Sequence, residues 1–141
     1  MALWLIAAIL AQGALALGLL WYLGTIRIPM VMKGEVRIDD IALERKGWPK
    51  REWQASNAFD NQFQLPVVFY VGALLALHFV PTIVEVALAW LFVLTRYLHA
   101  VVHVTDNHVV RRFAAYFVGL VVLCVFWLDL VVRLVLAAGG N

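Results

Sequence analysis

Long runs of apolar residues dominate this chain, and its polar residues are confined to short stretches between them. The runs span about 2–24, 61–80, 82–104 and 113–137. A helix needs about 20 mostly apolar residues to cross roughly 30 Å of hydrocarbon, and each run supplies that length. The pattern therefore predicts four membrane-crossing helices.

Polar turns extend two of the runs, so the predicted helices cover about 2–24, 57–80, 82–104 and 111–137. A long polar connection, about 25–56, separates the first two, and we expect a short helix near Ile38–Arg45 within it. Buried strands are a poor alternative, because lipid does not tolerate an open sheet edge and the runs lack the alternation of a barrel wall. We predict one all-α integral membrane domain over 1–141, a four-transmembrane-helix bundle.

Composition supports a membrane protein, since 65% of the residues are hydrophobic and 14% are charged, against about 25% charged in soluble domains. The first run lacks the basic start of a secretory signal, and its apolar part is too long, so we expect it to be a membrane helix. Cys124 is the single cysteine and lies within an apolar run. It cannot form an intramolecular disulfide, and we expect a core thiol.

Basic residues indicate the orientation, because Lys and Arg near helix ends are retained on the cytoplasmic side. The first connection holds Arg27, Lys33, Arg37, Arg45, Lys46, Lys50 and Arg51, and the third holds Arg111 and Arg112. Both termini are then periplasmic, and we expect the inner membrane of a bacterium. The net charge of +2 reflects this asymmetry and contact with membrane lipids, and it does not indicate nucleic acid.

One stripe of polar residues enters the second predicted helix. Asn57, Asp60, Asn61 and Gln64 are spaced i, i+3, i+4 and i+7, and they share one helical face. Pro66 follows and frees a backbone carbonyl nearby. Such a face cannot meet lipid, so it either forms interhelical hydrogen bonds or lines a cleft for a ligand, and both interpretations stay open.

A second polar face lies on the third predicted helix, where Arg96, His99 and His103 recur at i, i+3 and i+7. Arg96, His108, Arg111 and Arg112 together predict a basic rim opposite the amide stripe. Guanidinium groups bind carboxylates bidentately, so the pair of surfaces favours an anionic ligand. Arg111 and Arg112 have the alternative role of membrane anchors. We expect no metal, because zinc requires three or four converging ligands and His99 and His103 supply two.

Near the opposite membrane face lie Glu85, Asp129 and Arg133. Asp129 and Arg133 are spaced i, i+4, which suits an ion pair, and Glu85 lies at a similar depth. We interpret them as a structural pair or triad. A proton relay is the alternative, but it requires charges through the midplane, where the runs have none.

These residues resemble the membrane-associated proteins in eicosanoid and glutathione metabolism, the MAPEG family. The resemblance covers about Asn57 to Phe113 and the overall plan of four helices with a long first connection. Its two motifs are Asn61-Gln62-Phe63-Gln64-Leu65-Pro66, and Arg96-Tyr97-Leu98-His99 through His103 to Arg112. Each motif by itself is weak, and together they are moderately specific.

The resemblance implies a homotrimer that binds glutathione between neighbouring subunits. It also implies a site whose residues are Asn61, Gln64, Arg96, His99 and His103 for binding, with Arg112, or Arg111 as its substitute, activating the thiol. A nearby positive charge lowers the pKa of a thiol and raises the reactive thiolate fraction. In departure from the family, Gln64 stands where glutathione-binding members have Glu, and His103 stands where Tyr is usual.

Two functional hypotheses follow from the resemblance. One is a glutathione transferase or peroxidase that acts on a lipophilic small molecule entering from the bilayer. The other is a noncatalytic scaffold, assembly partner or lipid-binding protein whose polar stripe holds the subunits together. Fold alone does not decide between them.

Overall fold

The structure is a computed structural model that describes residues 1–41 and 47–139. Every regular element in this part of the chain is helical. The elements are α1 (Ala2–Met32), α2 (Ile38–Ile41), α3 (Lys50–Asp60), the 3₁₀ turn η1 (Asn61–Phe63), α4 (Leu65–His78), α5 (Ile83–Val104) and α6 (Val109–Gly139).

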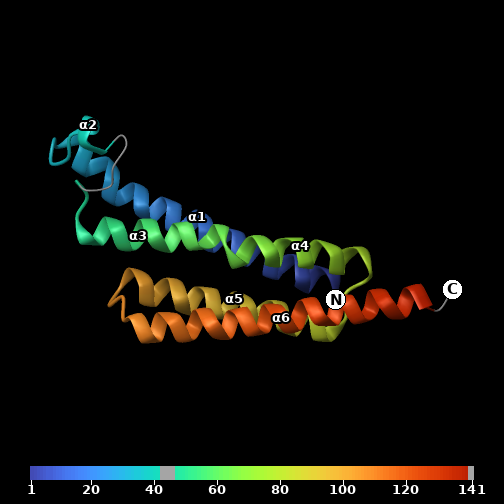
Figure 1. Ribbon diagram of the computed structural model, residues 1–141. Helices are drawn as coiled ribbons and strands as arrows, with labels where there is room; N and C mark the ends of the chain where they lie inside the picture. The colour runs from blue at the N-terminus through green and yellow to red at the C-terminus, as the bar shows by residue number, and fades with distance from the viewer. Residues whose placement is uncertain (42–46, 140–141) are drawn as a thin grey trace.

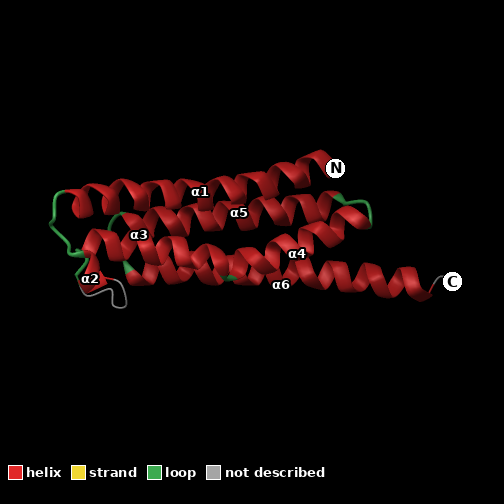
Figure 2. Ribbon diagram, turned by 90° about the horizontal axis from the view of Figure 1, so that it is seen from above, coloured by secondary structure: helices red, strands yellow, loops and turns green. Residues whose placement is uncertain are grey.

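The long helices lie nearly antiparallel in an elongated bundle (Figure 1). α1 packs beside α3 and α4, and α5 and α6 form a closely packed hairpin beneath them. Both termini point toward the end of the bundle that carries the α4–α5 turn. The α5–α6 turn and α2 lie at the other end, as the view from above also shows (Figure 2).

Three helices of the described chain are long and apolar enough to cross a membrane: α1, α5 and α6. α4 has 14 residues, which at 1.5 Å per residue gives about 21 Å, less than the thickness of the hydrocarbon. The second predicted helix, about 57–80, is divided in the structure among the end of α3, the turn η1 and α4. The bounds of the last two predicted helices are close, since α5 begins at Ile83 and α6 runs from Val109 to Gly139.

Pro66 explains where the second helix is interrupted. Proline has no N–H to donate to the carbonyl four residues earlier, and its ring clashes with that carbonyl. α3 ends at Asp60, η1 follows, and Gln64 leaves the helical region with φ −105° and ψ −107°. Side chains add hydrogen bonds where α3 ends: Asn61 Nδ2 donates to the Asn57 carbonyl at 2.7 Å, and Gln62 Nε2 donates to the Ala58 carbonyl at 3.0 Å.

The predicted connection of 25–56 is wrong at both ends. α1 continues to Met32, and α3 already begins at Lys50. An ion pair that the sequence did not predict joins the two extended helices: Arg27 on α1 binds Glu52 on α3 through Nε at 2.8 Å and through Nη2. Glu52 is fully buried, so it requires this partner. The short predicted helix is present as Ile38–Ile41, and the rest of it lies outside the described residues.

Aromatic rings and small residues fill the core between α4, α5 and α6. Phe69 stacks on Phe92 with ring centroids 4.8 Å apart and contacts Phe126 at 6.3 Å. Gly119 on α6 allows the closest approach, because a Cβ there would lie 2.6 Å from both Thr95 Oγ1 and Arg96 Nη2. Small residues at such crossings let membrane helices pack closely.

An ion pair joins α5 to α6 near the end where the termini lie. Arg133 binds Glu85 at 2.5 Å and also donates to the carbonyls of Phe79 and Val80. Glu85 is fully buried and closes a capping box with Thr82 at the start of α5. The expected pair is therefore Glu85 with Arg133.

Two expectations for α6 are wrong. Asp129 makes no ion pair with Arg133 in the structure, because the Arg133 guanidinium turns toward Glu85 and the α4–α5 turn. Cys124 is exposed on the surface of the bundle and is not a core thiol. Its neighbours Leu123 and Phe126 take the inward positions of this helical face.

Gly119 provides a test of the α5–α6 packing. We expect Gly119→Ala to lower the thermal unfolding midpoint in detergent, at a cost of about 1–3 kcal/mol, because the added methyl overlaps Thr95 and Arg96. Gly18→Ala is the matched control, since a Cβ at Gly18 meets nothing within 4 Å. An unchanged midpoint for Gly119→Ala would contradict the packing.

Candidate functional site

A polar cavity of about 510 Å³ lies between the end of α3, the last turns of α5 and the start of α6. Three helical faces line it. They are Asn57, Asp60, Asn61 and Gln64 from the α3–η1 segment, His99 and His103 from α5, and Val109, Arg112, Phe113 and Tyr116 from α6. The structure thus brings the predicted amide stripe and part of the predicted basic rim together.

The cavity walls formed by the α3–η1 segment and by α6 have the same residue spacing. The α6 residues recur at i, i+3, i+4 and i+7, as do the four residues of the polar stripe. On α6 this spacing presents side chains in one direction over two turns, whereas the polar stripe runs from α3 through η1 to Gln64. The interruption before Pro66 ends the polar wall, and the apolar part of α4 begins directly after it.

His103 connects three helices at the floor of the cavity. Its Nδ1 lies 3.1 Å from the Gln54 carbonyl of α3, and its Nε2 lies 3.0 Å from Arg112 Nη1 of α6. A carbonyl can only accept, so Nδ1 carries the proton, and Nε2 accepts from the guanidinium. His103 is therefore held as the neutral imidazole.

His99 is fixed in the same way one turn earlier. Its Nδ1 lies 3.1 Å from the Arg112 carbonyl, which again assigns the proton to Nδ1. The His99 ring lies 5.8 Å from the Tyr116 ring, and its Nε2 is buried without a partner. Both histidines thus brace the first turn of α6 against α5.

Arg112 is the cation that lines the cavity. Besides His103, its Nη1 donates to Asn107 Oδ1 at 2.6 Å. Asn107 has a φ of +52° in the α5–α6 turn, a left-handed conformation that Asn tolerates better than most residues. The turn therefore positions an acceptor that orients the guanidinium along the cavity wall.

Arg96 lies behind the cavity and does not line it, which corrects its predicted place on the rim. The residue is 1% exposed, and its guanidinium donates to the carbonyls of Ala115 and Tyr116 at 3.0 and 3.3 Å. It stacks on the Tyr116 ring at 5.0 Å and on Phe92 at 5.5 Å. Among the described residues, no carboxylate lies within ion-pair distance of it.

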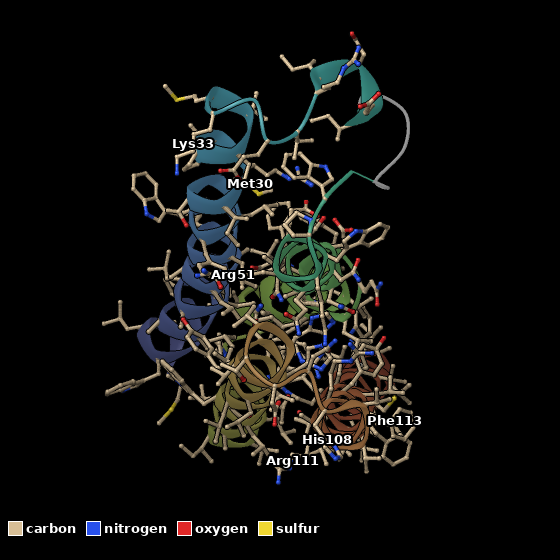
Figure 3. All side chains as sticks on the ribbon, turned by 90° about the vertical axis from the view of Figure 1, so that its left-hand side faces the viewer. Met30, Lys33, Arg51, His108, Arg111 and Phe113 are labelled. Carbon is tan, nitrogen blue, oxygen red and sulfur yellow. The ribbon has the colours of Figure 1, made fainter. Side chains whose placement is uncertain are left out.

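Arg111 and His108 were also expected on the rim, and both lie outside the cavity. Figure 3 shows their labelled side chains at the outer margin of the α5–α6 end of the bundle. Arg111 pairs with Asp106 at 3.3 Å, and its side chain is 69% exposed. Neighbouring residues on a helix point about 100° apart, so only Arg112 of the arginine pair can face inward.

Three apolar and aromatic residues of α6 that were not expected in the site also line the cavity: Val109, Phe113 and Tyr116. Their i, i+4 and i+7 spacing around Arg112 was the available signal, but apolar residues in a membrane helix carry little information on which way they face. Phe113 is 64% exposed and lies at the outer side of the bundle in Figure 3. The cavity is thus polar inside and apolar at its outer edge.

The arrangement suits the recognition of a small polar molecule. Its volume falls within the range of roughly 300–1,000 Å³ typical of small-molecule sites. Amide, hydroxyl, carboxylate and guanidinium groups converge on it. His103 has both ring nitrogens in use, so it is a poor metal ligand, and no group of three potential metal ligands occurs among the described residues.

Antiparallel apolar helices with a polar cavity near one end of the bundle define a helical integral membrane protein. The chain belongs to the MAPEG family, whose model matches residues 2–132 and so covers nearly the whole sequence. No curated protein and no solved structure matches the chain.

His103 offers a test of the cavity floor. We expect His103→Leu to lower the thermal unfolding midpoint in detergent, at a cost of about 1–3 kcal/mol, because it removes both hydrogen bonds through which His103 joins the Gln54 carbonyl to Arg112. His108→Leu is the control, since His108 lies outside the cavity and is exposed. Equal midpoints for the two variants would contradict the bridging role.

Proposed function

We propose that this protein is a glutathione-dependent transferase that acts on lipophilic electrophiles. The observation that carries the proposal is the inward orientation of Arg112 across the cavity from the amide stripe of Asn57, Asn61 and Gln64. Family membership supports it, because the motifs that resemble the glutathione-binding segments of the family supply both of these walls.

The lining fits the tripeptide. Glutathione carries two carboxylates and two peptide groups, which require a cation and several hydrogen-bonding amides. Arg112 can take a carboxylate or the sulfur, and Asn61 and Gln64 can exchange hydrogen bonds with the peptide groups. Arg96 adds positive potential from behind Tyr116, since it has no carboxylate partner among the described residues.

Glutathione supplies the nucleophile, a thiolate, when it is bound. Arg112 favours the ionised sulfur because a positive charge nearby stabilises the negative one, most strongly where water is scarce. The contacts with His103 and Asn107 hold the guanidinium in place, so little reorganisation is needed. A peroxidase reaction on a lipophilic peroxide uses the same thiolate.

The second substrate enters from the bilayer. Val109 and Phe113 combine a position in the cavity wall with high exposure, so they connect the polar interior with the surrounding hydrocarbon. An apolar molecule concentrated in the membrane can reach the cavity along this edge. The geometry thus supports a lipophilic substrate.

The proposed assembly is a homotrimer in the inner membrane of a bacterium. In this arrangement α3, η1 and α4 together make a fourth crossing, and both termini face the periplasm. Lys33 and Arg37, in the described part of the α1–α3 connection, support this orientation together with Arg111 and Arg112 at the start of α6. The connection next to α2 and the α5–α6 turn lie at one end of the bundle and the termini at the other (Figure 1). The cavity is then at the cytoplasmic side.

Binding and turnover test the enzymatic proposal directly. We expect the purified protein to bind glutathione in calorimetry and to form a conjugate with a hydrophobic electrophile such as an aryl halide. Arg112→Gln should lower the conjugation rate about 10–100-fold, because the thiolate loses its stabilising charge. Arg111→Gln is the matched control and should retain the rate, since Arg111 faces outward.

Absence of both glutathione binding and conjugate formation in the unaltered protein would remove the enzymatic proposal. Equal losses in the Arg111 and Arg112 variants would leave glutathione chemistry standing and contradict the assignment to Arg112. The thermal unfolding midpoint of each variant shows whether it is folded.

A noncatalytic scaffold is the second candidate function, and one observation favours it. Several polar groups of the cavity are already engaged within the chain: Asn61 with Asn57, and His99 and His103 with backbone carbonyls. Asn61→Leu separates the two functions. Loss of the trimer in size-exclusion chromatography favours the scaffold, whereas an intact trimer that no longer binds glutathione favours the binding site.

A further inference from the structure

Asp129 is the one acidic residue of α6, and it makes no ion pair with any residue of the described chain. The residue is half-buried, and its Oδ2 is buried without a hydrogen-bond donor. Arg133 lies one turn away but is committed to Glu85 and to two carbonyls of the α4–α5 turn. A carboxylate in a membrane helix requires a partner, so Asp129 has to find one outside this chain.

The end of the bundle near the termini offers no second Lys or Arg. Among the described Lys and Arg residues Arg133 alone lies there, since the others belong to the last turns of α1, the α1–α3 connection, α3, the middle of α5 and the start of α6. His78 ends α4, which packs on the Trp127 side of α6, because a Cβ at Gly72 would lie 3.1 Å from Trp127 Nε1. Asp129 is two residues further along, about 200° round the helix, and so points away from α4.

Asp129 lies near the boundary of the hydrocarbon. It is about 30 Å from the first residue of α6, and this rise is close to the thickness of the hydrocarbon layer. Because Arg133 binds Glu85 in the antiparallel hairpin, Asp129 is level with the first two turns of α5. Trp90 follows these turns, and its indole donates to the Trp4 carbonyl at 3.2 Å. Exposed indoles are typical of the headgroup layer, so Asp129 is at headgroup depth.

The face of α6 beside Asp129 is apolar and exposed. Five residues spaced i, i+3, i+7, i+10 and i+14 share it: Val118, Val121, Val125, Leu128 and Val132. Such a face suits an acyl chain that runs from headgroup depth toward the midplane. A second copy of the chain is a poorer occupant, because the same end of that copy also holds Arg133 alone, committed to its own Glu85.

We propose that Asp129 binds the ammonium group of a phosphatidylethanolamine headgroup, in the leaflet on the side of the termini, with an acyl chain along this apolar face. A primary ammonium has three N–H donors, and its hydrogen bond to a carboxylate is charge-assisted. The choline headgroup has the same charge but no N–H, so the site distinguishes two zwitterionic lipids. The inference is independent of the proposed function, because the polar cavity lies toward the other end of the bundle.

Native mass spectrometry tests the inference on protein released from nanodiscs of equal parts phosphatidylethanolamine and phosphatidylcholine with matched acyl chains. We expect the unaltered protein to retain phosphatidylethanolamine about tenfold more than phosphatidylcholine, because one charge-assisted hydrogen bond separates the two lipids. Asp129→Asn should retain both lipids equally, whereas Asp129→Glu should keep the preference. Asp106→Asn is the matched control and should also keep it, since Asp106 lies in the α5–α6 turn and pairs with Arg111 at 3.3 Å.

Equal retention of the two lipids by the unaltered protein overturns the inference, and this result needs no variant. An Asp129→Asn protein that still prefers phosphatidylethanolamine overturns it as well. The same spectra report the mass of the assembly, so an Asp129→Asn change that alters this mass and leaves the lipid ratio as it was would place Asp129 against a second copy instead. The thermal unfolding midpoint shows whether each variant is folded.

Discussion

The structure depends on one constraint: hydrocarbon offers no water to pair with a polar group, so each buried donor or acceptor must find its partner within the protein. The chain meets this constraint near both ends of the bundle. Glu85 and Arg133 join α5 to α6 near the termini, and Arg27 binds Glu52 between α1 and α3 at the other end. His103 adds a bridge from α3 through α5 to α6.

The same constraint explains why the cavity lies where it does. Pro66 interrupts the second helix, and the side-chain amides of Asn61 and Gln62 donate to carbonyls at the end of α3. The polar side chains of this segment then need a polar surface opposite, which α6 supplies through Arg112. The interrupted segment thus lines a polar cavity. Irregular backbone in membrane proteins commonly lies beside such a cavity.

Arg96 departs from the constraint, since its Nε and Nη1 are buried without a partner. Two backbone carbonyls and the rings of Phe92 and Tyr116 stabilise its charge only in part. A buried and incompletely paired cation raises the positive potential of its surroundings. We interpret its place directly behind Tyr116 as support for an anionic group in the adjacent cavity.

By itself the sequence determined the helical class, the approximate bounds of α5 and α6, and the two polar faces that meet in the cavity. Apolar runs and i, i+3, i+4 and i+7 spacing depend only on local geometry. Only the tertiary structure decided which arginine faces inward, that Arg96 lies behind the wall, and that Arg27 holds Glu52. These features depend on how each helix is rotated about its axis and on contacts between distant residues. In a membrane helix that is apolar all round, the sequence carries little information on either, which is also why Cys124 was wrongly expected in the core.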